Sequence, residues 1–73
     1  MKFIKCDESW VNFSEIKEIW VGRHHTSEGY VIYQKYGYNT HEYKQLFNTI
    51  YSSFSEALDD LEDFMDVHFG DER

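Results

Sequence analysis

Apolar and polar positions alternate over much of residues 2–50, as they do in short strands. The alternation predicts strands over residues 2–6, 18–25, 30–36 and 42–50, with a short aromatic segment at residues 10–13. Polar and glycine-containing turns are expected at residues 7–9, 14–15, 26–29 and 37–39. Residues 30–36 carry apolar side chains on both faces, so we expect this strand at the centre of the sheet.

The last element is a predicted helix over residues 54–69. Its apolar positions recur at helical spacing and form one stripe of roughly 120°: Phe54, Ala57, Leu58, Leu61, Phe64, Met65, His68 and Phe69. Ser53 and Glu56 have the spacing of a capping box, in which each side chain satisfies the other's backbone N–H. Gly70 is a natural stop.

These elements predict an α+β fold, a four-stranded antiparallel β-meander with one C-terminal amphipathic helix packed on one face. Successive short strands joined by short turns favour antiparallel neighbours. The 73 residues suffice for a single domain, residues 1–73. A domain of this size has a thin margin of stability, and its six Phe, six Tyr and two Trp supply much of the surface it can bury.

The cysteine count and the hydropathy indicate a compartment. Cys6 is the only cysteine, so an internal disulfide is excluded and a reducing, cytoplasmic environment is expected. Cys6 lies within the predicted first strand, so it is interpreted as a small strand residue rather than a reactive thiol. No apolar run is long enough for a signal peptide or a membrane span.

The formal net charge of −7 is concentrated in one segment. Residues 1–52 carry six acidic and six basic side chains, which sum to zero, whereas residues 53–73 carry eight acidic side chains and Arg73. Direct binding to nucleic acid needs a basic patch and is therefore not expected. A basic protein partner is favoured electrostatically.

The acidic side of the predicted helix is the candidate partner-binding site. It is formed by Glu56, Asp59, Asp60, Glu62, Asp63 and Asp66. Asp59–Asp63 and Glu62–Asp66 are like-charge pairs at i,i+4, which destabilise a helix. Three interpretations stay open: a solubilising face, a face that binds a basic protein, and a row of carboxylates that imitates nucleic-acid phosphates.

The chain resembles a group of small, mostly uncharacterised proteins of Gram-positive bacteria and their phages or prophages. Three segments carry the resemblance, namely Lys2-Phe3-Ile4, the run from Trp10 to Ile19 that reads W-V-N-F-S-E-I-K-E-I, and the run from Phe54 to Leu61. The resemblance implies the meander-plus-helix fold and a phage origin. It implies no active site, but it adds inhibition of host machinery to the functions to be considered.

Metal binding and catalysis are not expected, and no cofactor is predicted. Carboxylates on a straight helix diverge instead of converging on one cation. His24, His25 and His41 could suggest a transition-metal site, but His24 and His25 are expected on opposite faces of a strand and so cannot share one ion. His68 is expected in the apolar stripe of the helix. The sequence contains none of the G-x-S-x-G, P-loop, HExxH or CxxC motifs.

The sequence therefore favours a non-enzymatic binding or inhibitor protein whose acidic helix docks on a basic protein, as DNA mimics do when they block host defence. The alternative is a structural or assembly module that forms a homodimer or larger homo-oligomer, with the acidic side serving only solubility. For that alternative the candidate surface is a cluster of tyrosines, because tyrosine is enriched at interfaces: Tyr30, Tyr36, Tyr38 and Tyr43.

Overall fold

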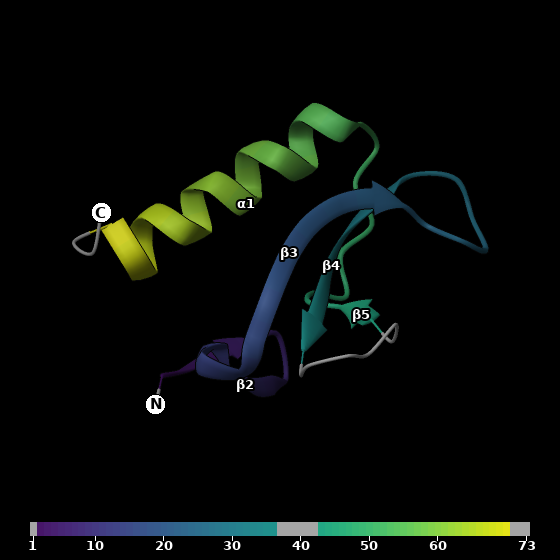
Figure 1. Cartoon of the computed structure of the whole chain (residues 1–73). Coiled ribbons are helices and arrows are strands. Elements are labelled where there is room, and N and C mark those ends of the chain that lie inside the picture. The colour runs from purple at the N-terminus through teal and green to yellow at the C-terminus, as the bar shows by residue number, and fades with distance from the viewer. Residues whose placement is uncertain (1, 37–42, 71–73) are drawn as a thin grey trace.

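The computed structural model describes residues 2–36 and 43–70 of the chain. Within them the order is β1 (Phe3–Cys6), β2 (Ser9–Asn12), the 3₁₀ helix η1 (Phe13–Glu15), β3 (Ile16–Arg23), β4 (Tyr30–Tyr36), β5 (Tyr43–Gln45) and α1 (Phe54–Phe69). The strands form two antiparallel sheets, β1-β2 and β3-β4-β5, and α1 runs alongside the longer sheet (Figure 1). The predicted α+β class and C-terminal helix are confirmed.

The prediction of a single four-stranded meander is wrong in its first part. Residues 9–12 form a true strand, which pairs with β1 and places Ile4 opposite Val11. The connecting turn is tight because Asp7 adopts a left-handed conformation with φ of 58°, which Asp tolerates better than most residues. η1 then redirects the chain before β3 starts, so the β1–β2 hairpin is a sheet of its own.

The predicted fourth strand is also shorter than expected. β5 ends at Gln45. Beyond it the chain still meets β4 where the Leu46 backbone N–H donates to the Ile32 carbonyl at 2.8 Å, and again at an isolated bridge between Tyr30 and Tyr51. A carboxylate oxygen of Asp7 accepts a hydrogen bond of 2.6 Å from the backbone N–H of Asn48. This long-range bond holds the segment after β5 against the first hairpin, away from a regular ladder with β4. The turn expected at residues 37–39 lies outside the described residues.

β4 is the central strand of the longer sheet, as predicted. It pairs with β3 over most of its length, with a register shift between Ile16 and Glu18. Gly22 in β3 makes room for the ring of Tyr33, because a Cβ at this glycine would lie only 3.1 Å from that ring. The Tyr33 hydroxyl then donates to the carbonyl of Arg23 at 2.9 Å, so one side chain ties the two strands together.

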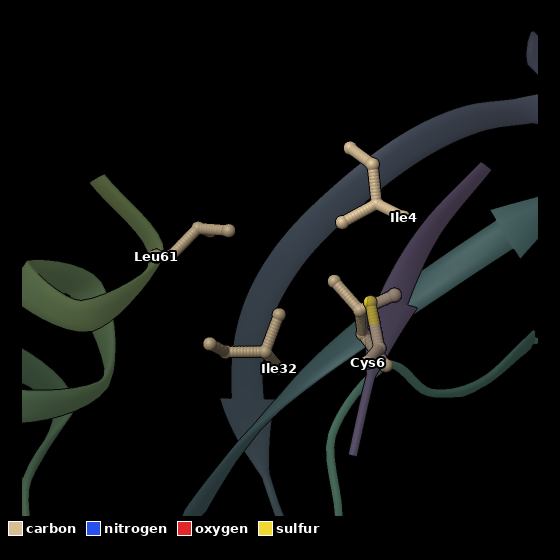
Figure 2. Close-up of a cluster of buried hydrophobic side chains, with 5 residues drawn as sticks. Ile4, Cys6, Ile32 and Leu61 are labelled. Carbon is tan, nitrogen blue, oxygen red and sulfur yellow. The ribbon is translucent and has the colours of Figure 1, made fainter. Parts of the chain in front are cut away.

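A small shared core joins the two sheets and the helix. Its buried members come from β1, β4, the segment after β5 and α1 (Figure 2): Ile4, Cys6, Ile32, Leu46 and Leu61. Ile32 has no exposed surface, and Leu61 reaches it from α1 while Ile4 and Cys6 reach it from β1. The helix and the β1–β2 hairpin therefore cover the same face of the β3-β4-β5 sheet.

The N-terminus of α1 is capped much as its sequence predicts. The Ser53 hydroxyl accepts a hydrogen bond of 3.2 Å from the Glu56 backbone N–H. The reciprocal half of the capping box is wrong, because the Glu56 carboxylate instead accepts from the Ser52 hydroxyl at 2.9 Å. The Glu56 carboxylate is therefore bound by Ser52, the residue before the cap, and not by the backbone N–H of Ser53.

α1 ends at Phe69 with Gly70 as its C-cap, as predicted, but Gly70 does not adopt the left-handed conformation of the usual glycine stop. Gly70 keeps right-handed helical geometry, with φ of −57°, and donates its N–H to the Asp66 carbonyl. Lys2 contacts this last turn: its ammonium donates to the His68 carbonyl and lies 4.4 Å from the centre of the Phe69 ring. A cation at a helix C-terminus is stabilising, so the first described residue caps the last turn of the chain's final element.

Replacing Ser53 with alanine removes the N-cap acceptor and should lower the free energy of unfolding by about 1 kcal/mol. Urea denaturation followed by far-UV circular dichroism measures the change. The matched control is Ser55→Ala in the first turn of the same helix, which removes a hydroxyl that accepts no backbone N–H and should change stability little. Equal losses in both variants would contradict a capping role for Ser53.

The pKa of the buried Cys6 thiol is raised to about 11 by burial and, second, by the negative charge of Asp7. The thiol is therefore protonated at neutral pH, and thiolate is the reactive form. We expect a disulfide reagent to modify Cys6 in the native protein far more slowly than in urea. A native rate close to the denatured rate would show that the core around Cys6 opens readily.

Candidate interaction surface

The acidic side chains of α1 all point away from the core. Because Ala57 and Leu61 are buried against the sheet, residues about half a turn away on the helix must face solvent. All six predicted partner-binding residues are exposed, and we call them the acidic face: Glu56, Asp59, Asp60, Glu62, Asp63 and Asp66. The helix carries no lysine or arginine, so nothing on α1 itself offsets their charge.

The carboxylates of the acidic face differ in whether other side chains bind them. Asp60 forms a side-chain hydrogen bond with Tyr51, just before the helix, and Glu56 receives the Ser52 hydroxyl. Asp66 also has an interaction partner. Among the described residues, Asp59, Glu62 and Asp63 have neither a hydrogen bond nor an ion pair. These three carboxylates therefore project into solvent without a compensating group.

Tyr51 links the acidic face to the sheet. Burial is the largest cause that raises its pKa to about 12, followed by the hydrogen bond to Asp60 and the charges of Asp60 and Asp7. Its backbone forms two hydrogen bonds with Tyr30, of 2.7 and 2.8 Å. Asp60 is thus a structural residue as well as a member of the acidic face, a role that its position in the helical pattern did not indicate.

The apolar stripe of α1 is only partly covered. Phe54 and Leu58 remain 49% and 36% exposed, and Val67, outside the stripe, is 78% exposed. Further along, a hollow of about 350 Å³ lies between α1 and the start of β3. It is lined by Phe13, Ile16, Lys17, Glu18, Ile19, Met65 and Phe69. Sequence reasoning missed this groove, because a periodic stripe does not reveal how much of it the sheet can cover.

The predicted tyrosine cluster does not form one surface. By strand alternation Tyr30 and Tyr36 lie on the helix-covered face of the sheet with Ile32, and Tyr30 contacts Phe54 edge-on at 6.0 Å. Tyr43 lies on the opposite face, where it packs against Trp20 and Tyr33 at 5.5 and 5.1 Å. Tyr38 lies outside the described residues.

A second exposed aromatic surface belongs to the β1–β2 hairpin. Phe3 and Trp10 are 52% and 66% exposed, and Trp10 borders a hollow of about 390 Å³ between the two sheets. Polar side chains share the lining of this hollow, among them Asn12, Gln34 and Lys44. The hollow therefore combines aromatic and amide groups.

The expectation that His24 and His25 point to opposite faces is wrong. β3 ends at Arg23, and the two imidazoles stack in the following loop with their centres 5.1 Å apart. The Nδ1 atom of His24 accepts from the backbone N–H groups of Thr26 and Ser27 at 3.3 and 3.1 Å, so this ring organises the loop. His68 is half-buried against Phe64, and His41 lies outside the described residues.

In the described part of the chain, no group of three or more His, Cys, Asp or Glu residues is placed to hold a metal ion. No described helix is both long and apolar enough to cross a membrane. Comparison of the chain with known protein families, with curated protein sequences and with solved structures finds no match.

The raised pKa of Tyr51, caused first by burial and then by Asp60, predicts a change in stability at alkaline pH. The folded state holds the phenol neutral, raising its pKa from 10.0 to about 12. The stabilisation is therefore complete below pH 10 and is lost as the pH rises through 12. In Tyr51→Phe we expect the urea midpoint to fall less between these pH values than in the wild type.

The control for this experiment is Tyr36→Phe, which removes a half-exposed hydroxyl at the other end of β4. It should retain the alkaline loss of the wild type. If Tyr51→Phe and Tyr36→Phe follow the same curve, the Tyr51 phenol contributes nothing to the pH dependence.

Proposed function

We propose that the protein is a non-enzymatic binding protein whose acidic face docks on a basic surface of another protein. The observation that carries the proposal is the row of exposed carboxylates on α1, of which Asp59, Glu62 and Asp63 have no compensating group in the described residues. Residues 1–52 are electrically neutral overall, so the field of the molecule originates at this helix.

In the isolated protein, repulsion between the carboxylates of α1 lowers the stability of the helix, and a basic partner removes this repulsion. Like charges at i,i+4, such as Asp59 with Asp63, each destabilise a helix by about 0.2–0.5 kcal/mol. Asp66 adds an anion near the helix C-terminus, where the dipole disfavours it. A partner that brings lysine or arginine to this face replaces repulsion with attraction and accelerates encounter.

In its most specific form the proposal makes the protein an inhibitor that imitates nucleic acid. Carboxylates on successive turns of α1 rise by about 4.5–6 Å per step, a spacing comparable with that of phosphates along a strand. Such a row suits the groove of a DNA- or RNA-binding protein. The resemblance to small phage and prophage proteins of Gram-positive bacteria supports a role in blocking host defence.

The alternative is an assembly module that acts by homo-oligomerisation. The observation that favours it is the exposure of Phe3 and Trp10 on the β1–β2 hairpin, since tryptophan is enriched at the centres of interfaces. In this alternative the net charge of −7 serves solubility.

Charge reversal in Asp59→Lys/Asp63→Lys tests the proposal. We expect affinity for the basic partner, once isolated from a bacterial lysate and purified, to fall by at least about tenfold, or 1.4 kcal/mol. Wild-type binding should weaken as salt rises, because exposed charges are screened. Calorimetric titration at low and high salt gives both results.

The matched control is Glu8→Lys/Glu28→Lys, which makes the same change in net charge at two exposed residues outside α1. The control should retain most of the wild-type affinity. Equal losses in both double variants would reduce the effect to overall charge, and unchanged binding in both would leave the acidic face a solubilising feature. A concentration-dependent dimer that tolerates both double variants but not Trp10→Ala would support the assembly module instead.

A further inference from the structure

One edge of the longer sheet is open. In the order β3-β4-β5, β3 pairs with β4 along one side and with no other strand among the described residues. The backbone carbonyl of Ile32 accepts from Leu46, so the peptide groups of Ile32 point toward the β5 side of β4. Because these directions alternate along a strand, the peptide groups of Val31 and Tyr33 point toward β3.

The same alternation identifies the unpaired groups on β3. Trp20 and Gly22 stand opposite Tyr33 and Val31, so their N–H and C=O groups are used in the ladder with β4. The N–H and C=O groups of Ile19 and Val21 consequently point out of the sheet. No hydrogen bond within the described residues satisfies them. An edge of this kind is a template for pairing with another chain.

The open edge is bordered by the apolar groove under α1. Met65 and Phe69 line this groove together with Ile19. Leu58 lies seven residues before Met65, two helical turns away on the same side of α1, and it remains 36% exposed. Backbone groups at a sheet edge combined with an apolar wall for alternate side chains are the two features that peptides use when they add a strand.

Charge selects the kind of strand that fits. Glu62 lies between Leu58 and Met65 along α1 and next to this side of the helix, and the exposed Glu18 belongs to β3 itself. A second copy of this chain would bring its own charge of −7 against this rim, which opposes pairing of two β3 edges.

The register shift next to Lys17 interrupts the ladder between β3 and β4, so the regular part of the open edge begins at Glu18.

We propose that the basic partner docks as an extended segment that adds a strand to the edge of β3, beside α1. The segment alternates apolar residues, which enter the groove, with lysine or arginine residues, which point to the opposite face of the sheet, where Glu18 stands across from Lys35. Basic residues beyond the paired stretch meet Glu62 and the acidic face. This inference rests on the proposed function and adds to it the form in which the partner binds. The acidic face steers the segment, and the backbone of Ile19 and Val21 holds it.

Amide hydrogen exchange followed by NMR tests this geometry directly. The probe is the capped peptide Lys-Val-Lys-Val-Lys-Val, and its control has proline in place of the central valine, which removes a donor and disrupts pairing. In the free protein the amides of Ile19 and Val21 should exchange faster than those of Trp20 and Gly22. With the probe at saturation, we expect exchange at Ile19 and Val21 to slow by at least about tenfold.

Saturable binding without added protection at Ile19 and Val21 would overturn strand addition while leaving a charge-mediated complex intact. The same conclusion follows if the proline peptide binds as tightly as the probe. Failure of the probe to bind at all would also overturn strand addition. The proposed function itself is judged with the purified basic partner, and it fails if Asp59→Lys/Asp63→Lys weakens that binding no more than Glu8→Lys/Glu28→Lys does.

A pair of side-chain variants gives an independent readout. Leu58→Gln removes exposed apolar surface from the side of α1 that borders the groove and should weaken binding of the probe by about tenfold. Val67→Gln is the matched control, because Val67 is nine residues further along, on the opposite side of α1, and is already 78% exposed. Thermal melts establish that both variants fold. Equal effects of the two changes would exclude the groove as the docking surface.

Discussion

The contact of Leu61 with Ile32 is the interaction on which the rest of the structure depends. Ile32 occupies the middle of the central strand and has no exposed surface, and Ile4 and Cys6 complete its cover from the first hairpin. Deleting a buried leucine side chain typically costs about 2–5 kcal/mol, a large share of the stability of so small a domain. The same contact sets the rotation of α1 about its axis and thereby turns the acidic side chains outward.

Two bonds at the ends of the core show how the fold accommodates an unfavourable helix. Lys2 reaches the last turn of α1 and offers a cation where the helix dipole favours one. Tyr51 binds Asp60 and connects the helix to the bridge with β4. These contacts stabilise the helix without neutralising Asp59, Glu62 or Asp63, so the exposed charge is preserved.

The docking geometry follows from combining charge with an open strand. Among the described residues α1 covers only part of the sheet, and its side nearest β3 borders the groove that contains Met65 and Phe69. An open apolar edge ordinarily invites self-association. Here like charge opposes pairing between copies, while a basic segment is attracted by the same carboxylates. In strand addition each feature has its own role: the charge of the acidic face selects the partner, and the edge of β3 supplies the affinity.

Four features followed from the sequence alone, because each depends on residues close together in the chain. They are the helix from Phe54 to Phe69, its Ser53 cap, the central position of β4 and the exposed carboxylates. The separate first hairpin, the short β5, the Lys2 cap and the Tyr51–Asp60 bond were decided by tertiary structure, together with the open edge and its groove. These features depend on contacts such as Asp7 with Asn48, between residues 41 positions apart. Periodicity identifies which side of a helix is apolar, but only the packed fold determines how much of that side remains uncovered.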